Sequence, residues 1–475
     1  MKKLSNILIL TLLFSLATSA QKTKIAVLKK LDSQSEKYGY IAMQIWNLAE
    51  MGYLEEQSSS LLQETLSNEG FTIKKGVANI PTAFIAEYGS GLPIIAILGE
   101  FDALPGLSQQ AIPEKKSANG DAGHACGHHL FGTASAAAAI SVKQWMQSTK
   151  QKGTIRFYGC PAEEGGGAKV YMARDGLFDD VDIALHWHPS SQNAASAAAA
   201  LANISAKFRF HGVSAHAAGA PEKGRSSLDG VEAMNAMVNM MREHVPQEAR
   251  IHYVITDGGK APNVVPDFAE VYYYSRHNSR DVVRSIFNRI VKAGEGAALG
   301  TGTTMDYEII NGVHELLPNL SLQKLVHDNL SAIGGVTYSA EEKEFAEKIA
   351  LSLGQTKADL DRAVNIQPYK ETAQAYGSTD VGDVSFVVPT VGFGTATWVP
   401  GTSAHSWQAV AAGGTSIGEK GMMVAAKTIT ATVIDLFKNQ ELIVKAKVEF
   451  KNRRGLNFIY KPLLGNRPPA LNYRK

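Results

Sequence analysis

A near-continuous apolar run, Leu92–Leu98, constrains the fold of this chain more than any other segment. Because it is apolar at successive positions, the strand that it predicts is buried on both faces, as in a parallel sheet covered by helices on both sides. Two further strands are predicted at Thr154–Tyr158 and Val181–Leu185, and all three end close to polar side chains. In open α/β sheets, chemistry gathers beyond the carboxyl ends of the strands. The pattern therefore predicts an α/β fold in which three strand ends carry reactive groups: Asp102, the pair Glu163 and Glu164, and His186.

The order of predicted elements changes between residues 203 and 312. There the chain reads strand, helix, strand, strand, helix, strand, which is the order of a ferredoxin-like unit. The predicted strands are 204–210, 251–256, 269–277 and 303–310, and the predicted helices are 227–241 and 280–297. A chain of 475 residues is long enough for two domains. We therefore expect residues 203–312 to form a domain inserted between two parts of a larger one, residues 21–202 and 313–475.

The start of the chain has the composition of a secretory signal peptide. Two lysines precede an apolar run, Ile7–Ala17, and small residues follow it up to Ala20. This run is too short to span a bilayer, so we predict that residues 1–20 are removed and that the protein is exported to the periplasm or the extracellular space. An uncleaved N-terminal anchor is the alternative. No other apolar run in the sequence approaches the length of a membrane span.

The charge balance does not favour nucleic acid or an anionic membrane surface as a partner. The formal net charge is +2, and it falls to zero without the two lysines of the predicted signal peptide. The segment from Lys445 onward is basic, with nine Lys or Arg residues and one acid. Apolar side chains within it, such as Phe450 and Leu463, suggest docking on the body, so a solvated basic edge is favoured over a binding arm.

The segment Gly123–His129 places one thiol and three imidazoles just before a predicted helix at residues 133–142. Groups of this kind at close spacing are typical ligands of transition metals. Because exported proteins form disulfides, a bond between Cys126 and Cys160 is the alternative interpretation. Cys160, however, directly precedes the segment that carries the paired carboxylates, which favours the metal site.

Glu163 and Glu164 follow a predicted buried strand and precede three glycines. Side chains of neighbouring residues on extended backbone point in opposite directions. One carboxylate can therefore bind a metal while the other faces the substrate water. A metal ion lowers the pKa of bound water from 15.7 toward about 7, and a nearby Glu can then move its proton to a leaving amine.

Four motifs carry a resemblance to a known family: Gly123–His128, Ala162–Gly167, Gly377–Asp383 and Gly401–Gln408. Together they resemble the dinuclear metallo-amidohydrolases of the peptidase M20 family, which includes aminoacylases, a folate-cleaving glutamate carboxypeptidase and plant auxin-conjugate hydrolases. They are most similar to members that act on p-aminobenzoyl-glutamate. The resemblance covers essentially the whole chain after the signal peptide. It implies a mixed-sheet catalytic domain with an inserted ferredoxin-like domain that serves as a lid and in dimerisation.

The resemblance also implies roles for individual residues of the catalytic domain. Two divalent metal ions would be held by five side chains: Cys126, His128, Glu164, His186 and His405. Glu163 would be the general base and then the general acid, and Asp102 would orient a ligand imidazole. Three further histidines flank these positions and either support the site or only pack against it: His124, His129 and His188.

In the inserted domain, the resemblance implies three residues that act on the substrate. His216, in the segment Gly212–Ala217, would stabilise the oxyanion in the site of the partner subunit across a dimer. Asn263 and Arg276 would hold the carboxylate of the substrate, for which a guanidinium is well shaped. We therefore expect a homodimer, or a heteromer with a paralogous subunit.

The ligand set does not specify one metal. Thiolate and imidazole favour zinc, whereas the carboxylates also admit manganese, cobalt or nickel. The expected function is hydrolysis of an amide between an acyl or aroyl group and an amino acid, with p-aminobenzoyl-glutamate-like conjugates as first candidates. A dipeptidase or an N-acyl-amino-acid deacylase with the same machinery is the nearest alternative. An exported protein that binds metal without catalysis is a third.

Overall fold

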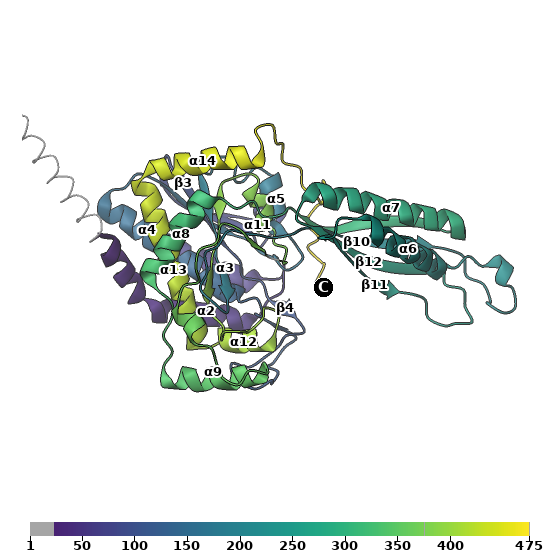
Figure 1. The fold of residues 1–475 in the computed structure, drawn as a ribbon, viewed down its shortest axis with the longest axis horizontal. Coiled ribbons are helices and arrows are strands. Elements are labelled where there is room, and N and C mark those ends of the chain that lie inside the picture. The colour runs from purple at the N-terminus through teal and green to yellow at the C-terminus, as the bar shows by residue number, and fades with distance from the viewer. Residues whose placement is uncertain (1–22, 375, 475) are drawn as a thin grey trace, which may run out of the picture.

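The computed structural model describes residues 23–374 and 376–474, which form a large body and an elongated second domain that projects from it (Figure 1). The predicted signal peptide, residues 1–20, lies outside the described residues. Within the described ranges, no helix combines the length and the apolar character needed to cross a membrane.

A six-stranded mixed sheet forms the centre of the body. Its strands in spatial order are β1 (Thr72–Lys75), β2 (Phe84–Ser90), β6 (Gly153–Gly159), β3 (Ile94–Gly99), β7 (Ile183–Leu185) and β15 (Thr390–Val391). Strands β6, β3, β7 and β15 are parallel, whereas β1 and β2 run antiparallel to their neighbours. The strand predicted from the run Leu92–Leu98 is β3, and all six of its residues are buried. The prediction of an α/β fold is confirmed.

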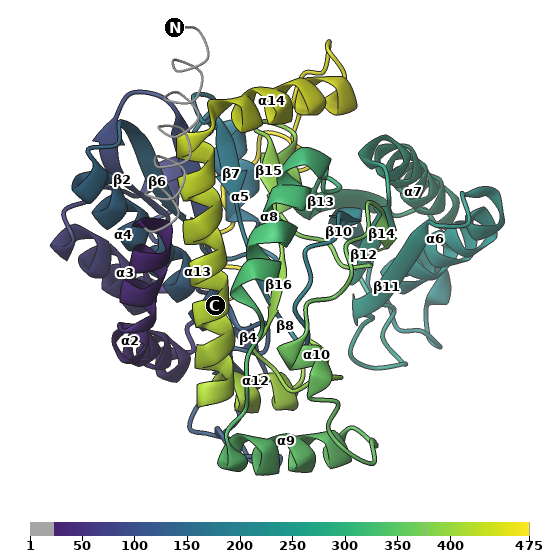
Figure 2. The same ribbon diagram turned by 60° about the vertical axis from the view of Figure 1, so that its left-hand side comes forward.

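Helices cover both faces of this sheet. The side chains of β3 alternate between the two faces and are apolar on each, so each face forms its own hydrophobic core. Ile95 and Ile97 face the larger core, built with α2 (Ser35–Leu48), α3 (Glu56–Asn68), α4 (His128–Thr149), α8 (Leu320–Ile333) and α13 (Ser416–Lys438). Ala96 and Leu98 face the smaller core, built with α5 (Ala168–Arg174) and α11 (Val381–Ser385). Figure 2 shows α13 passing in front of the sheet, and α13 packs against α8 on one side and against α4 on the other.

Helix α4 is buried along most of its length, since the small side chains of residues 134–139 let it approach β3 and α13 closely. The helix begins at His128, so a predicted metal ligand occupies its first position. The remaining elements of the body are short or peripheral: β4 (Leu104–Pro105), β5 (Ala122–Gly123), β8 (His188–Ser190), β9 (Ala198–Ala199), α9 (Ala340–Ser352), α10 (Asp361–Val364), β14 (Ala373–Gln374), β16 (Gly394–Ala396), α12 (Trp407–Gly413) and α14 (Gln440–Arg454).

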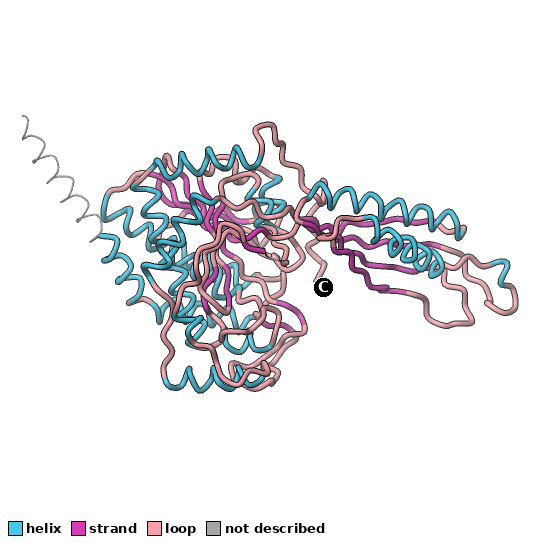
Figure 3. Tube along the Cα trace, in the orientation of Figure 1, coloured by secondary structure: helices cyan, strands magenta, loops and turns pink. Residues whose placement is uncertain are grey.

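The second domain contains the predicted order of strand, helix, strand, strand, helix, strand. Its elements are β10 (Ala202–His211), α6 (Ser227–Met241), β11 (Arg250–Asp257), β12 (Phe268–His277), α7 (Arg280–Thr301) and β13 (Thr304–Val313). The strands form an antiparallel sheet in the order β11-β12-β10-β13, and both helices pack on it (Figure 3). Val271 and Tyr273 of β12 are buried in the core of this domain, whereas the alternate residues Tyr272, Tyr274 and Arg276 lie on the other face.

The C-terminal segment, residues 455–474, leaves α14 and runs to the junction of the two domains (Figure 1). Leu464 belongs to the smaller core of the body, and Leu463 packs in the core of the inserted domain. The sequence predicts apolar docking here, but it also favours a solvated basic edge. The structure differs on the second point, because the guanidiniums of Arg467 and Arg474 bind backbone carbonyls of the inserted domain and the body.

Candidate active site

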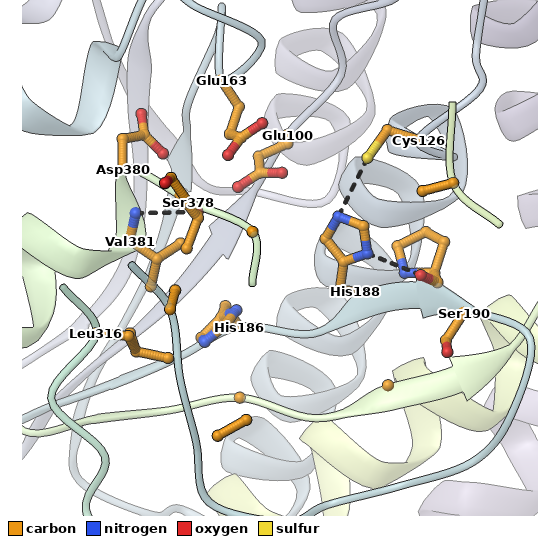
Figure 4. A pocket seen from close by; sticks show the side chains of 18 of the residues that line it. Glu100, Cys126, Glu163, His186, His188, Ser190, Leu316, Ser378, Asp380 and Val381 are labelled. Atoms are coloured by element: carbon orange, nitrogen blue, oxygen red, sulfur yellow. Dashed lines mark hydrogen bonds between the residues drawn. The ribbon is translucent and has the colours of Figure 1, made fainter. Parts of the chain in front are cut away.

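A cavity of about 1220 Å³ lies beyond the carboxyl ends of the parallel strands. Glu100 directly follows β3, and Glu163 and Glu164 lie four and five residues after the last residue of β6. Figure 4 shows Glu100 and Glu163 close to one another, with Cys126 and His188 on the other side of the view. The arrangement agrees with the general placement of chemistry at strand ends.

Three groups of side chains have ligand atoms within 4.8 Å of one another, close enough to hold metal ions. They are Cys126 with His128 and His188, Cys126 with Glu164 and His405, and Glu100 with His128 and Glu163. Cys126 and His128 each belong to two groups, which links the three into one cluster. A thiol, imidazoles and carboxylates arranged in this way are a donor set for divalent transition metals.

The cluster also contains a buried ring nitrogen that a metal ion would satisfy. Among the described residues, Nε2 of His128 has no hydrogen-bond partner, although the Oε2 atom of Glu100 lies 3.1 Å away. Buried polar atoms are nearly always paired. The residues present therefore fit the dinuclear metal site that the resemblance implies.

Asp102 contacts two of the predicted ligands at once. Its Oδ1 atom lies 2.8 Å from Nδ1 of His128, and its Oδ2 accepts a hydrogen bond of 2.9 Å from the backbone N–H of Glu164. Burial alone would raise the pKa of Asp102, but the charge and the hydrogen bond of His128, together with the backbone N–H of Glu164 and the charge of Lys169, more than offset burial and lower the pKa. An ionised Asp102 fixes the ring of His128 so that Nε2 faces the cluster.

The glycine before His128 is required by its surroundings. Gly127 has a φ of +74°, and a Cβ atom at this position would lie 2.7 Å from the Cβ atom of Pro189. The same strand segment, β8, carries His188 toward Cys126, with Nε2 of the ring 3.4 Å from Sγ. A side chain at residue 127 would therefore separate α4 from the strand that completes the cluster.

Glu163 lies in a strongly negative environment. Burial, together with the charges of Glu100 and Glu164, raises the pKa of its carboxyl well above the ordinary value. A carboxyl group with a raised pKa can both accept and return a proton near neutral pH. The environment therefore suits the role that the sequence predicts for Glu163.

Glu164 and His405 form a pair at the mouth of the cavity. Nε2 of His405 lies 3.0 Å from Oε1 of Glu164, and the hydrogen bond raises the pKa of the imidazole. The backbone N–H of His405 donates to the carbonyl of Ala125, which ties the loop that carries His405 to the segment of Cys126.

His186 does not join the groups that the sequence predicts for it. The backbone N–H groups of residues 186 and 188 both bond to the neighbouring strand, so the two imidazoles face the same side but are about 6–7 Å apart along the chain. This register places His188 beside Cys126 and leaves His186 against Gly392 (Figure 4). His186 lines the same cavity, and burial lowers the pKa of its ring to about 3.

A buried lysine that the sequence analysis does not single out organises the back of the cluster. Nζ of Lys169 lies 2.7 Å from a carboxylate oxygen of Glu100 and 2.7 Å from one of Asp380. Burial lowers the pKa of Lys169, but the charges of Asp380 and Glu100, with those of Cys160 and Glu163, more than offset this, and the group is charged at neutral pH. Asp380 and Glu100 lie in segments with recognisable sequence signals, whereas Lys169 sits on a short helix without one.

Both cysteines are free thiols, so the alternative of a disulfide between Cys126 and Cys160 is not realised in the structure. Burial, followed by the charge of Glu164, raises the pKa of the Cys126 thiol well above its usual range. A divalent cation reverses this preference, because a coordinating thiol is deprotonated.

Of the three residues predicted in the inserted domain to act on the substrate, one lines the cavity and two do not. Arg276 lines the cavity, with its guanidinium 5.3 Å from the centre of the Tyr274 ring. His216 and Asn263 are not among the residues that line it. Their loops are held together by a hydrogen bond from the backbone N–H of Ala217 to the carbonyl of Asn263. Within one chain, the structure therefore brings Arg276 to the site and leaves the other two outside.

Comparisons with known proteins agree with this description. A family model described as the peptidase dimerisation domain matches residues 201–299. The chain is 40% identical over 469 residues to one of the subunits of p-aminobenzoyl-glutamate hydrolase from Escherichia coli (strain K12), a match that covers 93% of this chain and 97% of that protein. It is 27% identical over 452 residues to the Xaa-Arg dipeptidase of Mus musculus, covering 92% of this chain and 94% of the relative.

A solved structure has the same fold. It is a Bacillus subtilis protein, described as a dinuclear metal-binding peptidase from the M20 family, with a TM-score of 0.58 and 16% sequence identity. The superposition covers 86% of this chain and 99% of that chain. The likeness therefore extends over both the body and the inserted domain.

Proposed function

Because the chain belongs to the M20 family of metallopeptidases and amidohydrolases, we propose that it hydrolyses the amide bond between an acyl or aroyl group and an amino acid. Conjugates that resemble p-aminobenzoyl-glutamate are the first substrate class, since a relative with 40% identity is named for this activity. The observation that carries the proposal is that Cys126, Glu163, Glu164 and His405 line one cavity and that His128 joins them in the groups of potential metal ligands.

Two divalent metal ions would be held by the clustered side chains: Cys126, His128, Glu164, His188 and His405. The geometry favours His188 over His186 as the imidazole from their shared strand segment. Zinc or manganese suits this mixed set best, and cobalt or nickel is also compatible. When bound, the ions supply Lewis-acid activation of water and of the amide oxygen.

The residues of the chain supply the remaining chemistry. Glu163 takes the proton of the attacking water and returns it to the leaving amine, a task that suits a carboxyl with a raised pKa. Asp102 keeps the His128 ring in one orientation. Arg276 binds a carboxylate of the substrate, because its guanidinium lines the cavity and its Nε has no partner within the described part of the chain.

The second domain is of the dimerisation type, and this supports a site completed by a partner subunit. We propose that His216 stabilises the oxyanion in the cavity of the partner, with Asn263 beside it, since both lie outside the cavity of their own chain. A homodimer is the simplest assembly. The bacterial relative is named as one of the subunits of its enzyme, which also supports a heteromer with a paralogous chain.

Export remains part of the proposal. Residues 1–20 have the pattern of a signal peptide, and it predicts a mature protein in the periplasm or outside the cell. Sequencing the N-terminus of the protein after expression in its native host tests this directly.

The proposed activity is tested by Glu163→Gln in a substrate panel of p-aminobenzoyl-glutamate, N-acyl amino acids and dipeptides. We expect the variant to keep its metal ions and to lose about 10²- to 10⁴-fold in rate, the range for removing an acid–base group. Glu64→Gln, at an exposed position on α3, is the control and should leave the rate unchanged.

The panel separates the alternatives. Turnover of dipeptides alone would replace the first candidate by a dipeptidase, a function supported by the name of the murine relative. Bound metal in the wild type without turnover of any substrate, and therefore no effect of Glu163→Gln on the rate, would favour a non-catalytic metal-binding protein.

A further inference from the structure

The C-terminal segment is anchored to both domains before it reaches the cavity. The guanidinium of Arg467 donates a hydrogen bond of 2.9 Å to the carbonyl of Ile310 on β13. Upstream of it, Leu463 and Leu464 pack in the cores of the two domains. The last described residues of the chain are therefore held at the domain junction, where Figure 1 shows the C-terminus.

Tyr473 and Arg474 end this segment inside the site. The hydroxyl of Tyr473 and Nη2 of Arg474 both donate to the backbone carbonyl of Glu164, at 3.0 and 2.7 Å. The Tyr473 ring packs edge-on against Tyr53, with ring centres 5.5 Å apart. It fills space left by Gly52, where a Cβ atom would lie 2.2 Å from the hydroxyl. These contacts fix the position of Arg474 relative to a proposed metal ligand.

The guanidinium of Arg474 retains unused binding capacity. Arg474 lines the cavity, and its buried Nε has no hydrogen-bond partner among the described residues. A guanidinium carries five N–H donors in a rigid planar fork. A carboxylate matches this fork with two parallel hydrogen bonds, so the unpaired edge is suited to a carboxylate ligand.

Arg276 lines the same cavity as Arg474. Tyr272, Tyr274 and Arg276 alternate along β12 and face the side away from its helices. The Tyr272 and Tyr274 hydroxyls are 3.3 Å apart, and Arg276 lies over the Tyr274 ring. Burial raises the pKa of Tyr272, and the charge of Arg474 acts on this phenol in the opposite direction. Tyr274 therefore contacts Arg276, and the charge of Arg474 reaches Tyr272 of the same strand.

We infer that Arg474 is a substrate-binding residue that receives the side-chain carboxylate of the amino acid in the substrate, while Arg276 receives its α-carboxylate. The inference rests on the proposed amidohydrolase function and narrows its substrate class to conjugates of dicarboxylic amino acids. A conjugate of glutamate carries two carboxylates, and the cavity presents two guanidiniums with unpaired Nε atoms in the described structure.

Besides Arg276 and Arg474, one more lysine or arginine side chain lines the described cavity, that of Lys370. Lys370 is exposed, so water competes for its ammonium group. Arg474, in contrast, is partly buried and held by Glu164. The structure therefore assigns selectivity to Arg474 rather than to the general charge of the cavity.

The experiment compares p-aminobenzoyl-glutamate with its isostere p-aminobenzoyl-glutamine, which keeps the α-carboxylate but has an uncharged side chain. Both are assayed with the metal-loaded wild type and with Arg474→Gln, Arg474→Lys, Lys370→Gln and Arg453→Gln. Arg453 lies on α14, outside the cavity, and its variant controls for loss of one charge in the same region. Binding of both compounds is also measured by calorimetry in a Glu163→Gln background, where turnover is suppressed.

For Arg474→Gln we expect a loss of about 10- to 100-fold in kcat/KM for the glutamate conjugate, mainly through KM, as for one charge-assisted hydrogen-bond pair. The glutamine conjugate should change less than about 3-fold, and Arg474→Lys should recover part of the loss. Lys370→Gln should cost less than Arg474→Gln, and Arg453→Gln should match the wild type.

Three outcomes would overturn the inference: equal losses for both conjugates, which indicate a structural role of Arg474; equal losses for Lys370→Gln and Arg474→Gln; or no loss for Arg474→Gln. Failure of the wild type to hydrolyse any conjugate would instead remove the proposed function. The calorimetric preference for the glutamate conjugate would still test Arg474 in that case.

Discussion

Asp102 is the residue on which the geometry of the candidate metal site depends most directly. It accepts hydrogen bonds with both carboxylate oxygens, one from the ring of His128 and one from the backbone of Glu164. An asparagine could accept only one of these bonds, and its NH₂ group would face the other donor. The substitution therefore disturbs a ligand without removing it.

We expect Asp102→Asn to lower metal affinity by about 10- to 100-fold, as is typical for partners that orient a ligand. Competition with a chelator measures this affinity, and metal content and activity should fall together at limiting metal. Asp328→Asn, at an exposed position on α8, is the control. Unchanged metal affinity in Asp102→Asn would show that the His128 ring is oriented by other contacts.

The sequence identifies most of the clustered residues but not their exact roles. Cys126, His128, Glu164 and His405 come together as predicted because each lies in a motif with its own chemical signal. The sequence analysis takes His186 rather than His188 as a ligand, whereas the structure places His188 beside Cys126, because the choice depends on where the strand meets α4. Lys169 gives no signal because a lone lysine on a short helix is far more often exposed than buried.

At the scale of elements, the junction between Gly127 and α4 sets how close the helix comes to β8. The first residue of α4 is His128, and β8 carries His188. A Cβ atom at residue 127 would meet Pro189 of the same strand, and the backbone there is in a conformation that L residues rarely adopt. The close packing of Gly127 against Pro189 therefore positions both α4 and the metal cluster.

Gly127→Ala should destabilise the protein by about 2–4 kcal/mol, from the left-handed backbone and the overpacking together. Gly76→Ala is a matched control, because Gly76 also has a positive φ of 65° but no atom lies within 4 Å of its added Cβ. It should cost only about 1 kcal/mol. Denaturant unfolding measures both, and equal losses would show that backbone strain alone accounts for Gly127.

Elements were more predictable than the contacts between them. The buried strand β3 and the order of the inserted domain follow from hydrophobic periodicity, which is a local property of the chain. The pairing of β8 with β16 joins segments that are far apart in the sequence, and no local pattern specifies it. The spacing of His186 and His188 in the site depends on this pairing.

At the scale of the whole molecule, the contact between Asp383 and Tyr460 joins the body to the C-terminal segment. The Tyr460 hydroxyl donates to Oδ1 of Asp383 at 2.7 Å, and the backbone N–H of His314 donates to Oδ2 at 3.0 Å. Burial raises the pKa of Asp383 from 3.8 to about 7. The sequence predicts apolar docking of this segment, but it does not predict a buried carboxyl beneath it.

The raised pKa of Asp383 makes stability depend on pH. Between pH 3.8 and about 7 the folded protein binds more protons at this residue than the unfolded chain, so stability falls as pH rises through this window. In Asp383→Asn this contribution is absent. As the pH rises from 3.8 to about 7, the variant should therefore gain stability relative to the wild type. The substitution can also have a cost that does not depend on pH, and this cost does not alter the trend.

Thermal unfolding of the two proteins across this pH range tests the expectation. Asp281→Asn, at an exposed position on α7, should keep the pH dependence of the wild type. A constant difference between Asp383→Asn and the wild type at all pH values would contradict the raised pKa.

The buried Lys169 has a consequence for the life cycle of the enzyme. The ammonium group of Lys169 lies between Glu100 and Asp380, and Asp102 holds the ring of His128 by a hydrogen bond that does not require a metal ion. The negative groups around the site are therefore partly balanced before any metal arrives. We therefore expect the chain to fold before metal is loaded, in contrast to small domains whose folding requires the ion.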